Sequence, residues 1–439
     1  MKVLKFGGTS VGSAQRMKEV AKLITDGEQK IVVLSAMSGT TNTLVEISDY
    51  LYKKNPEGAN EIINKLEAKY KQHIDELFAT QEYKQKGLEV VKSHFDYIRS
   101  YTKDLFTLFE EKVVLAQGEL ISTAMVNFYL QECGVKSALL PALEFMRTDK
   151  NAEPDPVYIK DKLRAQLDLY PDTEIYITQG FICRNAYGEI DNLQRGGSDY
   201  TASLIGAAVN ASEIQIWTDI DGMHNNDPRI VDKTAPVRQL HFEEAAELAY
   251  FGAKILHPTC IQPAKYANIP VRLLNTMDPE APGTLISNDT EKGKIKAVAA
   301  KDNITAIKIK SSRMLLAHGF LRKVFEIFES YQTSIDMICT SEVGVSVTID
   351  NTKHLNEILD DLKKYGTVTV DKEMCIICVV GDLEWENVGF EAKALDAMRD
   401  IPVRMISFGG SNYNISFLIR ECDKKVALQS LSDMLFNGK

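Results

Sequence analysis

The stretch Met1-Lys2-Val3-Leu4-Lys5-Phe6-Gly7-Gly8-Thr9-Ser10-Val11-Gly12 decides the fold. Residues 3–6 predict a short buried strand, and apolar residues at positions 17, 20, 21 and 24 predict a helix after it. Between them, Gly7 and Gly8 allow a tight turn whose backbone N–H groups can approach a ligand closely. A strand, a glycine turn and a helix N-terminus together favour an anion, so the stretch predicts phosphate binding.

The stretch differs from two common phosphate loops. Gly7 and Gly12 have the glycine spacing of a Walker A loop, but Ser13-Ala14 follow where Lys-Ser/Thr is required. The spacing G-x-G-x-x-G of dinucleotide sites is not present either. The lysine of this stretch, Lys5, precedes the glycines and stands on the predicted strand.

Composition bounds the function classes. The 439 residues suggest two to four domains, and the net charge of -10 without a basic stripe argues against nucleic acid as a partner. No apolar run is long enough to predict a membrane span. Seven scattered cysteines and no signal peptide indicate a reducing, cytoplasmic setting. The lone Cys375-x-x-Cys378 pair lies in a predicted strand and is interpreted as structural.

Predicted strands alternate with predicted helices up to about residue 275, which implies a largely parallel sheet with helices on both faces. Residues 57–112 are rich in Glu, Lys, Leu and Tyr and predict a helical insert or lid. A further helix is expected from Gln117 to about Glu132. Residues 277–297 collect proline and glycine and predict a linker.

The remaining part of the chain contains a repeat with an offset of about 70 residues. Gly319-Phe320-Leu321-Arg322-Lys323 is similar to Gly389-Phe390-Glu391-Ala392-Lys393, and each is expected to open a helix. Alternating strands are predicted later in each copy, at 345–349 and 414–419. The repeat therefore predicts two β-α-β-β units.

Several blocks, in order along the chain, resemble those of aspartate kinases in the amino-acid kinase superfamily. They are Lys5 to Val11, Gly118-Glu119, Arg195 to Thr201, Trp217-Thr218-Asp219, Asp227-Pro228-Arg229, Phe251 to Pro258 and Ser341-Glu342. The repeat resembles tandem ACT domains, which bind free amino acids as regulators.

The resemblance implies an α/β fold, namely a three-layer sandwich with a mostly parallel sheet, followed by tandem ferredoxin-like ACT domains. It implies a catalytic domain over 1–295, with the insert at about 57–112, and a regulatory region over 296–439. The first ACT domain is expected at 311–380, and the second at 302–310 plus 381–439. ACT domains pair across subunits, so a homodimer or larger homo-oligomer is expected.

The implied reaction transfers the γ-phosphoryl group of ATP to the β-carboxylate of L-aspartate, giving 4-phospho-L-aspartate in the lysine, threonine and methionine pathway. A carboxylate nucleophile is already ionised near neutral pH, so no general base is required. Catalysis then depends on positioning and on neutralising the phosphoryl oxygens. Mg²⁺ is expected to bridge the phosphates while largely hydrated, so no protein metal ligand is predicted.

Residue roles follow from the resemblance and from side-chain chemistry. Lys5 is expected to stabilise the transferring phosphoryl group, and Asp199 to orient Lys5 and Arg195 rather than to act as a base. A planar guanidinium grips a carboxylate bidentately, so Arg195 suits the α-carboxylate of aspartate, while Glu119 suits its α-ammonium. The other expected substrate contacts are Ser35, Thr41 and Ser198. The expected nucleotide contacts are Lys5, Gly7, Gly8, Ser10, Thr218, Asp219, His224, Arg229, Lys254 and Ile255.

An effector pocket is also implied. Its expected residues are Met314, Phe320, Leu321, Ser334, Asp336, Thr340, Ser341 and Glu342. Asp336 or Glu342 would pair with a ligand ammonium, and lysine is the first effector expected. Ala317 stands where lysine-sensitive relatives often carry Ser, which removes one hydrogen bond.

Three other readings stay open at this point. Another amino-acid kinase, acting on glutamate, acetylglutamate or carbamate, is the first alternative, although the Arg195 loop and the ACT pair argue against it. A dinucleotide-dependent oxidoreductase is the second, and it lacks the G-x-G-x-x-G motif. A non-catalytic amino-acid sensor that kept only the fold is the third.

Overall fold

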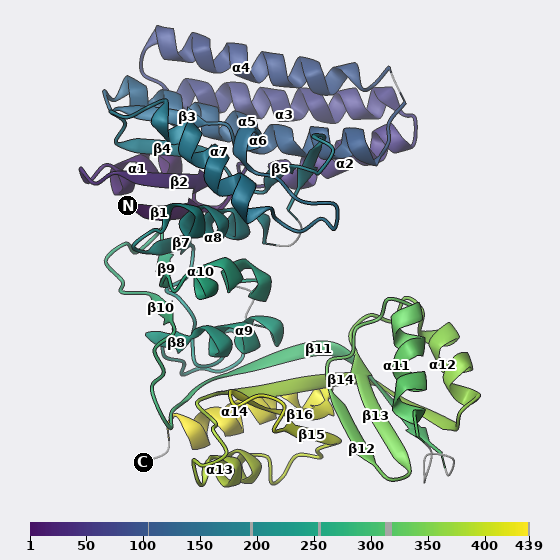
Figure 1. Cartoon of the computed structure of the whole chain (residues 1–439). Helices are drawn as coiled ribbons and strands as arrows, with labels where there is room; N and C mark the ends of the chain where they lie inside the picture. The colour runs from purple at the N-terminus through teal and green to yellow at the C-terminus, as the bar shows by residue number, and fades with distance from the viewer. Residues whose placement is uncertain (104, 194–195, 253–255, 312–317, 438–439) are drawn as a thin grey trace. The chain divides into compact units, whose positions relative to one another are not determined.

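The computed structural model describes residues 1–103, 105–193, 196–252, 256–311 and 318–437 (Figure 1). The chain forms two compact units, which are described separately. The first comprises Met1–Met223 and Leu256–Asn288, and the second comprises His224–Ile255 and Asp289–Lys439.

The first unit is built on a mostly parallel sheet, as predicted. Its strands are β1 (Lys2–Phe6), β2 (Lys30–Leu34), β3 (Ser137–Leu140), β4 (Ile175–Gln179), β7 (Ile214–Thr218), β9 (Val271–Asn275) and β10 (Thr284–Ser287). They lie in the order β3-β4-β2-β1-β7-β9-β10. The central strand β1 is parallel to both β2 and β7, and among the described pairings of these seven strands β10 runs antiparallel to its neighbour β9.

Helices cover both faces of this sheet. The core on one face is shared with α1 (Ala14–Ile24), α2 (Thr40–Tyr52) and α5 (Leu108–Glu132), and α3 (Pro56–Leu77) and α4 (Gln81–Ser100) pack onto these helices. Leu4 and Phe6 belong to that core. Alternation along a strand turns Lys5 to the opposite face, where α8 (Gly197–Val209) contacts β1, β2 and β7. The unit is therefore a three-layer sandwich.

Shorter elements complete the first unit. They are α6 (Ala142–Phe145), α7 (Pro156–Asp168), the hairpin of β5 (Ile182–Arg184) with β6 (Ile190–Asn192), the 3-10 turn Pro258–Ile261 and α10 (Gln262–Tyr266). β10 falls inside the predicted linker 277–297, so that part of the prediction was wrong. The prediction failed because the segments that flank this strand are rich in proline and glycine, as linkers are.

The helical insert is confirmed, but its boundary with the next helix is not where the sequence suggested. α5 begins at Leu108 rather than at Gln117. Thr107 caps it: its hydroxyl accepts from Phe109 N at 3.3 Å, while Glu110 accepts from Thr107 N at 2.8 Å. α5 is long and apolar enough to cross a membrane, but 72% of its most apolar window is buried inside the protein, as expected for a central core helix.

The second unit contains β8 (Gln239–His241), α9 (Phe242–Tyr250) and a large antiparallel sheet. The strands of this sheet are β11 (Ile295–Lys310), β12 (Ile338–Ser341), β13 (Gly344–Ile349), β14 (Thr367–Gly381), β15 (Met405–Phe408) and β16 (Asn414–Arg420). Their order is β12-β13-β11-β14-β16-β15. The helices are α11 (Phe320–Ser330), α12 (Leu355–Lys363), α13 (Phe390–Ala397) and α14 (Lys424–Leu435), with a 3-10 turn at Glu421–Asp423. The predicted repeat is thereby confirmed, because α11 and α13 begin at equivalent positions.

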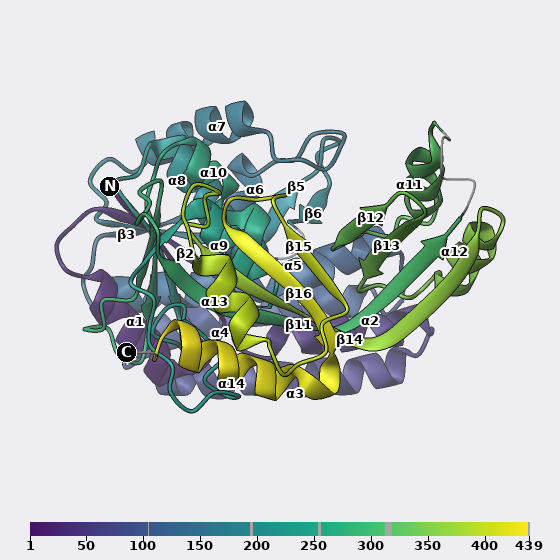
Figure 2. The same ribbon diagram turned by 90° about the horizontal axis from the view of Figure 1, so that it is seen from below.

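The two long strands β11 and β14 lie side by side and run through both halves of this sheet (Figure 2). Ile307 and Ile309 of β11 pack in a core with α11 and α12, whereas Val298 packs in a second core with α13 and α14. The sequence-based bounds assigned 302–310 to the C-terminal ACT domain. In the structure it is the earlier half of β11, at Val298, that packs in the core of that domain, and the later half packs in the core of the first one. One strand can serve two cores because its pairing with β14 continues past register shifts near Ile304.

Candidate active site

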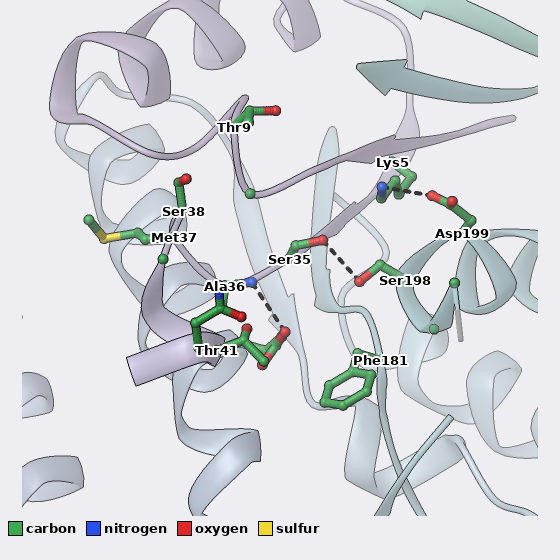
Figure 3. Close-up of a pocket in the computed structure, with 16 residues that line it drawn as sticks. Lys5, Thr9, Ser35, Ala36, Met37, Ser38, Thr41, Phe181, Ser198 and Asp199 are labelled. Atoms are coloured by element: carbon green, nitrogen blue, oxygen red, sulfur yellow. Dashed lines mark hydrogen bonds and ion pairs between the residues drawn. The ribbon is translucent and has the colours of Figure 1, made fainter. Parts of the chain in front are cut away.

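The candidate site lies where parallel strands of the first unit end at the same edge of the sheet. β1 runs into Gly7-Gly8, and β2 runs into the loop at Ser35 to Gly39. In α/β sheets this edge is the usual place for a ligand. A cavity of about 470 Å³ opens there (Figure 3). Its lining residues are Lys5, Gly8, Thr9, Ser35, Ala36, Met37, Ser38, Gly39, Thr41, Asn42, Glu119, Phe181, Gly196, Gly197, Ser198 and Asp199.

Lys5 and Asp199 form an ion pair inside the cavity. The Nζ–Oδ1 distance is 2.7 Å, and each side chain is 13% exposed (Figure 3). The pair follows from the fold, because Lys5 faces the α8 side of the sheet and Asp199 lies in the first turn of α8. The helix N-terminus also favours a carboxylate at this position. The structure therefore brings together both predicted catalytic residues.

Ser35 and Ser198 meet from opposite elements. The Ser35 hydroxyl donates to that of Ser198 at 2.9 Å, and Ser35 N donates to the Phe6 carbonyl at 3.2 Å. Gly180, at the end of β4, makes this approach possible: a Cβ there would lie 2.5 Å from Ser198 Oγ. Two predicted substrate residues are thus held in contact across the floor of the cavity.

Glu119 is the most unusual ionisable group of the cavity. Its side chain is 3% exposed, and Oε1 accepts from the backbone N–H of Ala36 at 3.3 Å. Within the described ranges, no group donates to Oε2, although that atom is buried. Burial raises the pKa of Glu119 to about 8. A buried carboxylate with an unused acceptor is suited to receive an ammonium group.

The loop after β2 supplies residues that the sequence analysis did not single out. Ala36, Met37, Ser38, Gly39 and Asn42 line the cavity beside the predicted Thr41. The loop lies against Gly8, where a Cβ would stand 2.9 Å from the Ala36 carbonyl oxygen. The polar turn Met37-Ser38-Gly39-Thr40-Thr41-Asn42 after a predicted strand indicates a ligand-binding loop from the sequence alone, although Thr41 is the one residue of this turn to which the sequence assigned a contact.

Phe181 is a further lining residue without a sequence signal. Its φ of 69° lies in the left-handed region, which bulky residues rarely adopt. The backbone N–H of Phe181 donates to Thr201 Oγ1 at 3.1 Å, which ties the residue to α8. Strain of this kind often accompanies a functional site.

The predicted nucleotide residues of the first unit divide into two groups. Lys5 and Gly8 line the cavity, whereas Gly7 and Ser10 do not. The Ser10 hydroxyl is buried and lies 2.8 Å from that of Thr276, so it faces the protein.

Thr218 ends β7, the strand next to β1, the exposed Asp219 follows it, and the Thr218 hydroxyl donates to the Asp219 carboxylate at 3.1 Å. They share the sheet edge with the cavity but do not line it. Their role in nucleotide binding stays a prediction.

Other predicted nucleotide residues lie elsewhere. His224 and Arg229 belong to the second unit. The His224 Nδ1 lies 3.0 Å from Thr234 Oγ1, and Arg229 pairs with Asp227 at 2.7 Å. Arg195, Lys254 and Ile255 lie outside the described residues, so their predicted contacts stay predictions.

The predicted effector residues lie around α11 and β12 in the second unit. Phe320 and Leu321 open α11, Ser334 follows it, Thr340 and Ser341 end β12, and Glu342 follows β12. Phe320 is part of the hydrophobic core. Met314 lies outside the described residues.

Asp336 has partners within the protein. Its side chain is 1% exposed, and Oδ1 lies 2.7 Å from Lys301 Nζ. The Tyr250 hydroxyl donates to the same oxygen at 2.7 Å. Burial raises the pKa of Asp336, although both partners oppose that effect. An ammonium group of this chain is therefore already paired with Oδ1 of this carboxylate, whereas Oδ2 is buried and has no hydrogen-bond partner among the described residues.

Comparisons with known proteins agree with this fold and site. The family described as amino acid kinase matches residues 1–275, and an ACT domain matches residues 377–435. These matches define the chain as an amino acid kinase with an ACT region.

More specific relatives are also found. Aspartokinase 1, chloroplastic, of Arabidopsis thaliana is 36% identical over 99% of this chain and 80% of its own length. Lysine-sensitive aspartokinase 3 of Escherichia coli is 32% identical over 99% of both chains. The crystal structure of E. coli aspartokinase III in complex with aspartate and ADP superimposes with a TM-score of 0.85, at 32% identity over 99% of this chain and 100% of that one. The chain belongs to the aspartokinase family of ATP-dependent kinases.

Proposed function

We propose that this chain transfers the γ-phosphoryl group of ATP to the β-carboxylate of L-aspartate, giving 4-phospho-L-aspartate. One observation carries the choice of an amino acid as acceptor: the buried carboxylate of Glu119 has an unused oxygen in the same cavity as Lys5. The α-ammonium of an amino acid would supply the missing charge and hydrogen bonds. The solved relative in complex with aspartate and ADP supports the same reaction.

Side chains of the cavity then divide the work. The acceptor carboxylate is ionised at neutral pH, so it attacks phosphorus without a general base. Lys5 neutralises negative charge on the transferring phosphoryl oxygens. The Asp199 carboxylate, 2.7 Å from Lys5 Nζ, holds the Lys5 side chain in place. The Gly8 backbone allows close approach of the phosphates. The packing of β1 against α8 holds this pair in place, so little reorganisation is needed at the moment of transfer.

Substrate orientation is assigned to the remaining polar groups. Ser35, Ser198 and Thr41 line the cavity with hydroxyl groups that suit the acceptor carboxylate. Arg195, adjacent to the lining residue Gly196, is proposed for the α-carboxylate. This division would place the β-carboxylate of aspartate near Lys5 and its ammonium at Glu119.

On the nucleotide side we propose Gly7, Thr218 and Asp219 from the sheet edge, whereas Ser10 is buried against Thr276 and would support the turn rather than contact the nucleotide. His224, Arg229, Lys254 and Ile255 are proposed from their resemblance alone. Mg²⁺ would supply further charge neutralisation, held by phosphate oxygens and water. The described residues offer it no group of three His, Cys, Asp or Glu side chains.

Regulation by an amino acid, with lysine first, is proposed for the ACT region. The E. coli relative is named lysine-sensitive, which supports lysine. Because Lys301 pairs with Oδ1 of Asp336 while Oδ2 has no partner among the described residues, an effector ammonium would bind at Oδ2 of Asp336 or at Glu342. We also propose a catalytic domain over 1–295, an ACT region over 296–439, a homodimer or larger assembly through that region, and a cytoplasmic location. The seven cysteines are all free, which supports a reducing compartment.

The test is aspartate-dependent release of ADP by the full chain in the presence of Mg²⁺. We expect turnover with aspartate and none with glutamate, and lower turnover when lysine is added at about millimolar concentration. Threonine and methionine serve as comparison effectors. Turnover with glutamate but not aspartate would overturn the proposed substrate, and indifference to lysine would overturn the proposed effector.

A further inference from the structure

The helical insert touches the cavity loop through two consecutive residues of α3. Tyr70 Oη lies 3.0 Å from Thr40 Oγ1, and Lys69 Nζ donates to the Ser38 carbonyl oxygen at 3.2 Å. Ser38 lines the cavity, and Thr40 stands next to Thr41, which also lines it. Neither Tyr70 nor Lys69 lines the cavity itself.

Packing alone does not require the Tyr70 hydroxyl. Tyr70 is fully buried, and its ring packs against Phe95 with centroids 5.7 Å apart. Phenylalanine would fill the same space without burying a polar group. A buried hydroxyl is costly unless it is hydrogen-bonded, and Thr40, at 1% exposure, provides the bond. Burial raises the pKa of Tyr70, so the phenol stays neutral and the bond persists across the working pH range.

The loop is confined from the other side by α5. A Cβ on Gly118 would lie 2.8 Å from the Ala36 Cβ and 3.1 Å from the Thr40 Cγ2. The same loop sends the Ala36 N–H to Glu119. A small displacement of the loop would therefore move two groups at once: the hydroxyl of Thr41 and the Ala36 N–H that donates to Glu119.

We propose that Tyr70 and Lys69 are positioning residues that hold the loop Met37–Thr41 in the geometry that binds the acceptor amino acid. The inference rests on the proposed function, because it assumes that Glu119 and Thr41 contact that substrate. It gives the helical insert a role in acceptor affinity. The Tyr70 bond is buried and is the stronger of the two, whereas the Lys69 bond is solvent-exposed and contributes less.

Steady-state kinetics of the full chain test the proposal. In Tyr70→Phe and in Thr40→Val we expect the aspartate KM to rise about tenfold, with kcat and the ATP KM within about twofold of wild type. In the double variant the aspartate KM should rise no more than in either single variant, because both substitutions remove the same hydrogen bond. Thr40→Ser keeps the hydroxyl and should restore the aspartate KM. Lys69→Met should have a smaller effect of the same kind.

Lys65→Met is the matched control, because Lys65 lies on the same helix and pairs only with Glu61 on the surface among the described residues. It should leave every constant unchanged. Equal rises of the aspartate and ATP KM in Tyr70→Phe, or a lower Tm with an unchanged aspartate KM, would show a merely structural role and overturn the proposal.

Hydrogen exchange separates this proposal from the proposed function. Amides of residues 37–41 should exchange faster in Tyr70→Phe than in wild type and in Lys65→Met, with no substrate present. A wild-type chain without aspartate-dependent turnover would overturn the proposed function, while the exchange result still decides whether the insert holds the loop. Unchanged exchange together with an unchanged aspartate KM would overturn the positioning role.

Discussion

Aspartate affinity should increase as the pH rises from about 7 to 9, because Glu119 must lose a proton to receive the substrate ammonium. Its carboxyl is buried beside the Ala36 N–H, and burial raises its pKa to about 8. At pH 7 roughly one tenth of free enzyme molecules then carry an ionised Glu119, against roughly nine tenths at pH 9. The aspartate KM should therefore fall about tenfold over this interval, while the ATP KM changes little.

Folding stability should respond in the opposite direction. The folded-state pKa of Glu119 lies above its ordinary value of 4.5, so the folded chain retains a proton that the unfolded chain releases. The contribution of this group is fully present below about pH 4.5 and is lost as the pH rises through about 8. Since one pKa unit corresponds to about 1.36 kcal/mol, the loss is on the order of 5 kcal/mol at most.

The assay measures aspartate-dependent ADP release at several pH values, with urea unfolding of the same samples without substrate. Glu119→Gln should flatten both the aspartate KM profile and this part of the stability profile. Glu111→Gln is the matched control, because Glu111 lies on the same helix and bonds the Tyr52 hydroxyl at the surface. An aspartate KM that is equal at pH 7 and 9 in wild type, or a tenfold change that persists in Glu119→Gln, would refute the reasoning.

Three further changes test other parts of the molecule. Lys5→Met should lower kcat by at least about 100-fold, since the charge on the phosphoryl oxygens is then uncompensated; turnover within tenfold of wild type would contradict this role. Gly118→Ala should lower the free energy of unfolding by about 1–3 kcal/mol, because the new Cβ would lie 2.8 Å from the Ala36 Cβ. A Tm equal to wild type would show that the loop moves aside without loss of stability. Asp336→Asn should destabilise the full chain by about 1–2 kcal/mol in urea unfolding, because it removes one of the two ion pairs of Lys301 and leaves the pair with Asp350; an unchanged midpoint would mean that the pair contributes nothing.

Local patterns predicted local structure well. The glycine turn after residues 3–6, the helical insert and the repeat could all be read from apolar spacing and from glycine positions, because these depend on neighbours in the chain. The start of α5 was missed because Leu108 to Glu111 resemble the preceding insert in composition, and only the cap at Thr107 marks the break. The division of β11 between two cores has no local signature at all.

The sequence by itself determined that Lys5, Glu119 and Asp199 are candidates, through their motifs and the charge chemistry of phosphoryl transfer. Only the tertiary structure decided how they act together. Strand alternation turns Lys5 toward α8 and its Asp199, and the close packing of α5 buries Glu119 under the loop at Ala36. These partners are far apart in the chain, so their distances, burial and pKa values arise from register and packing.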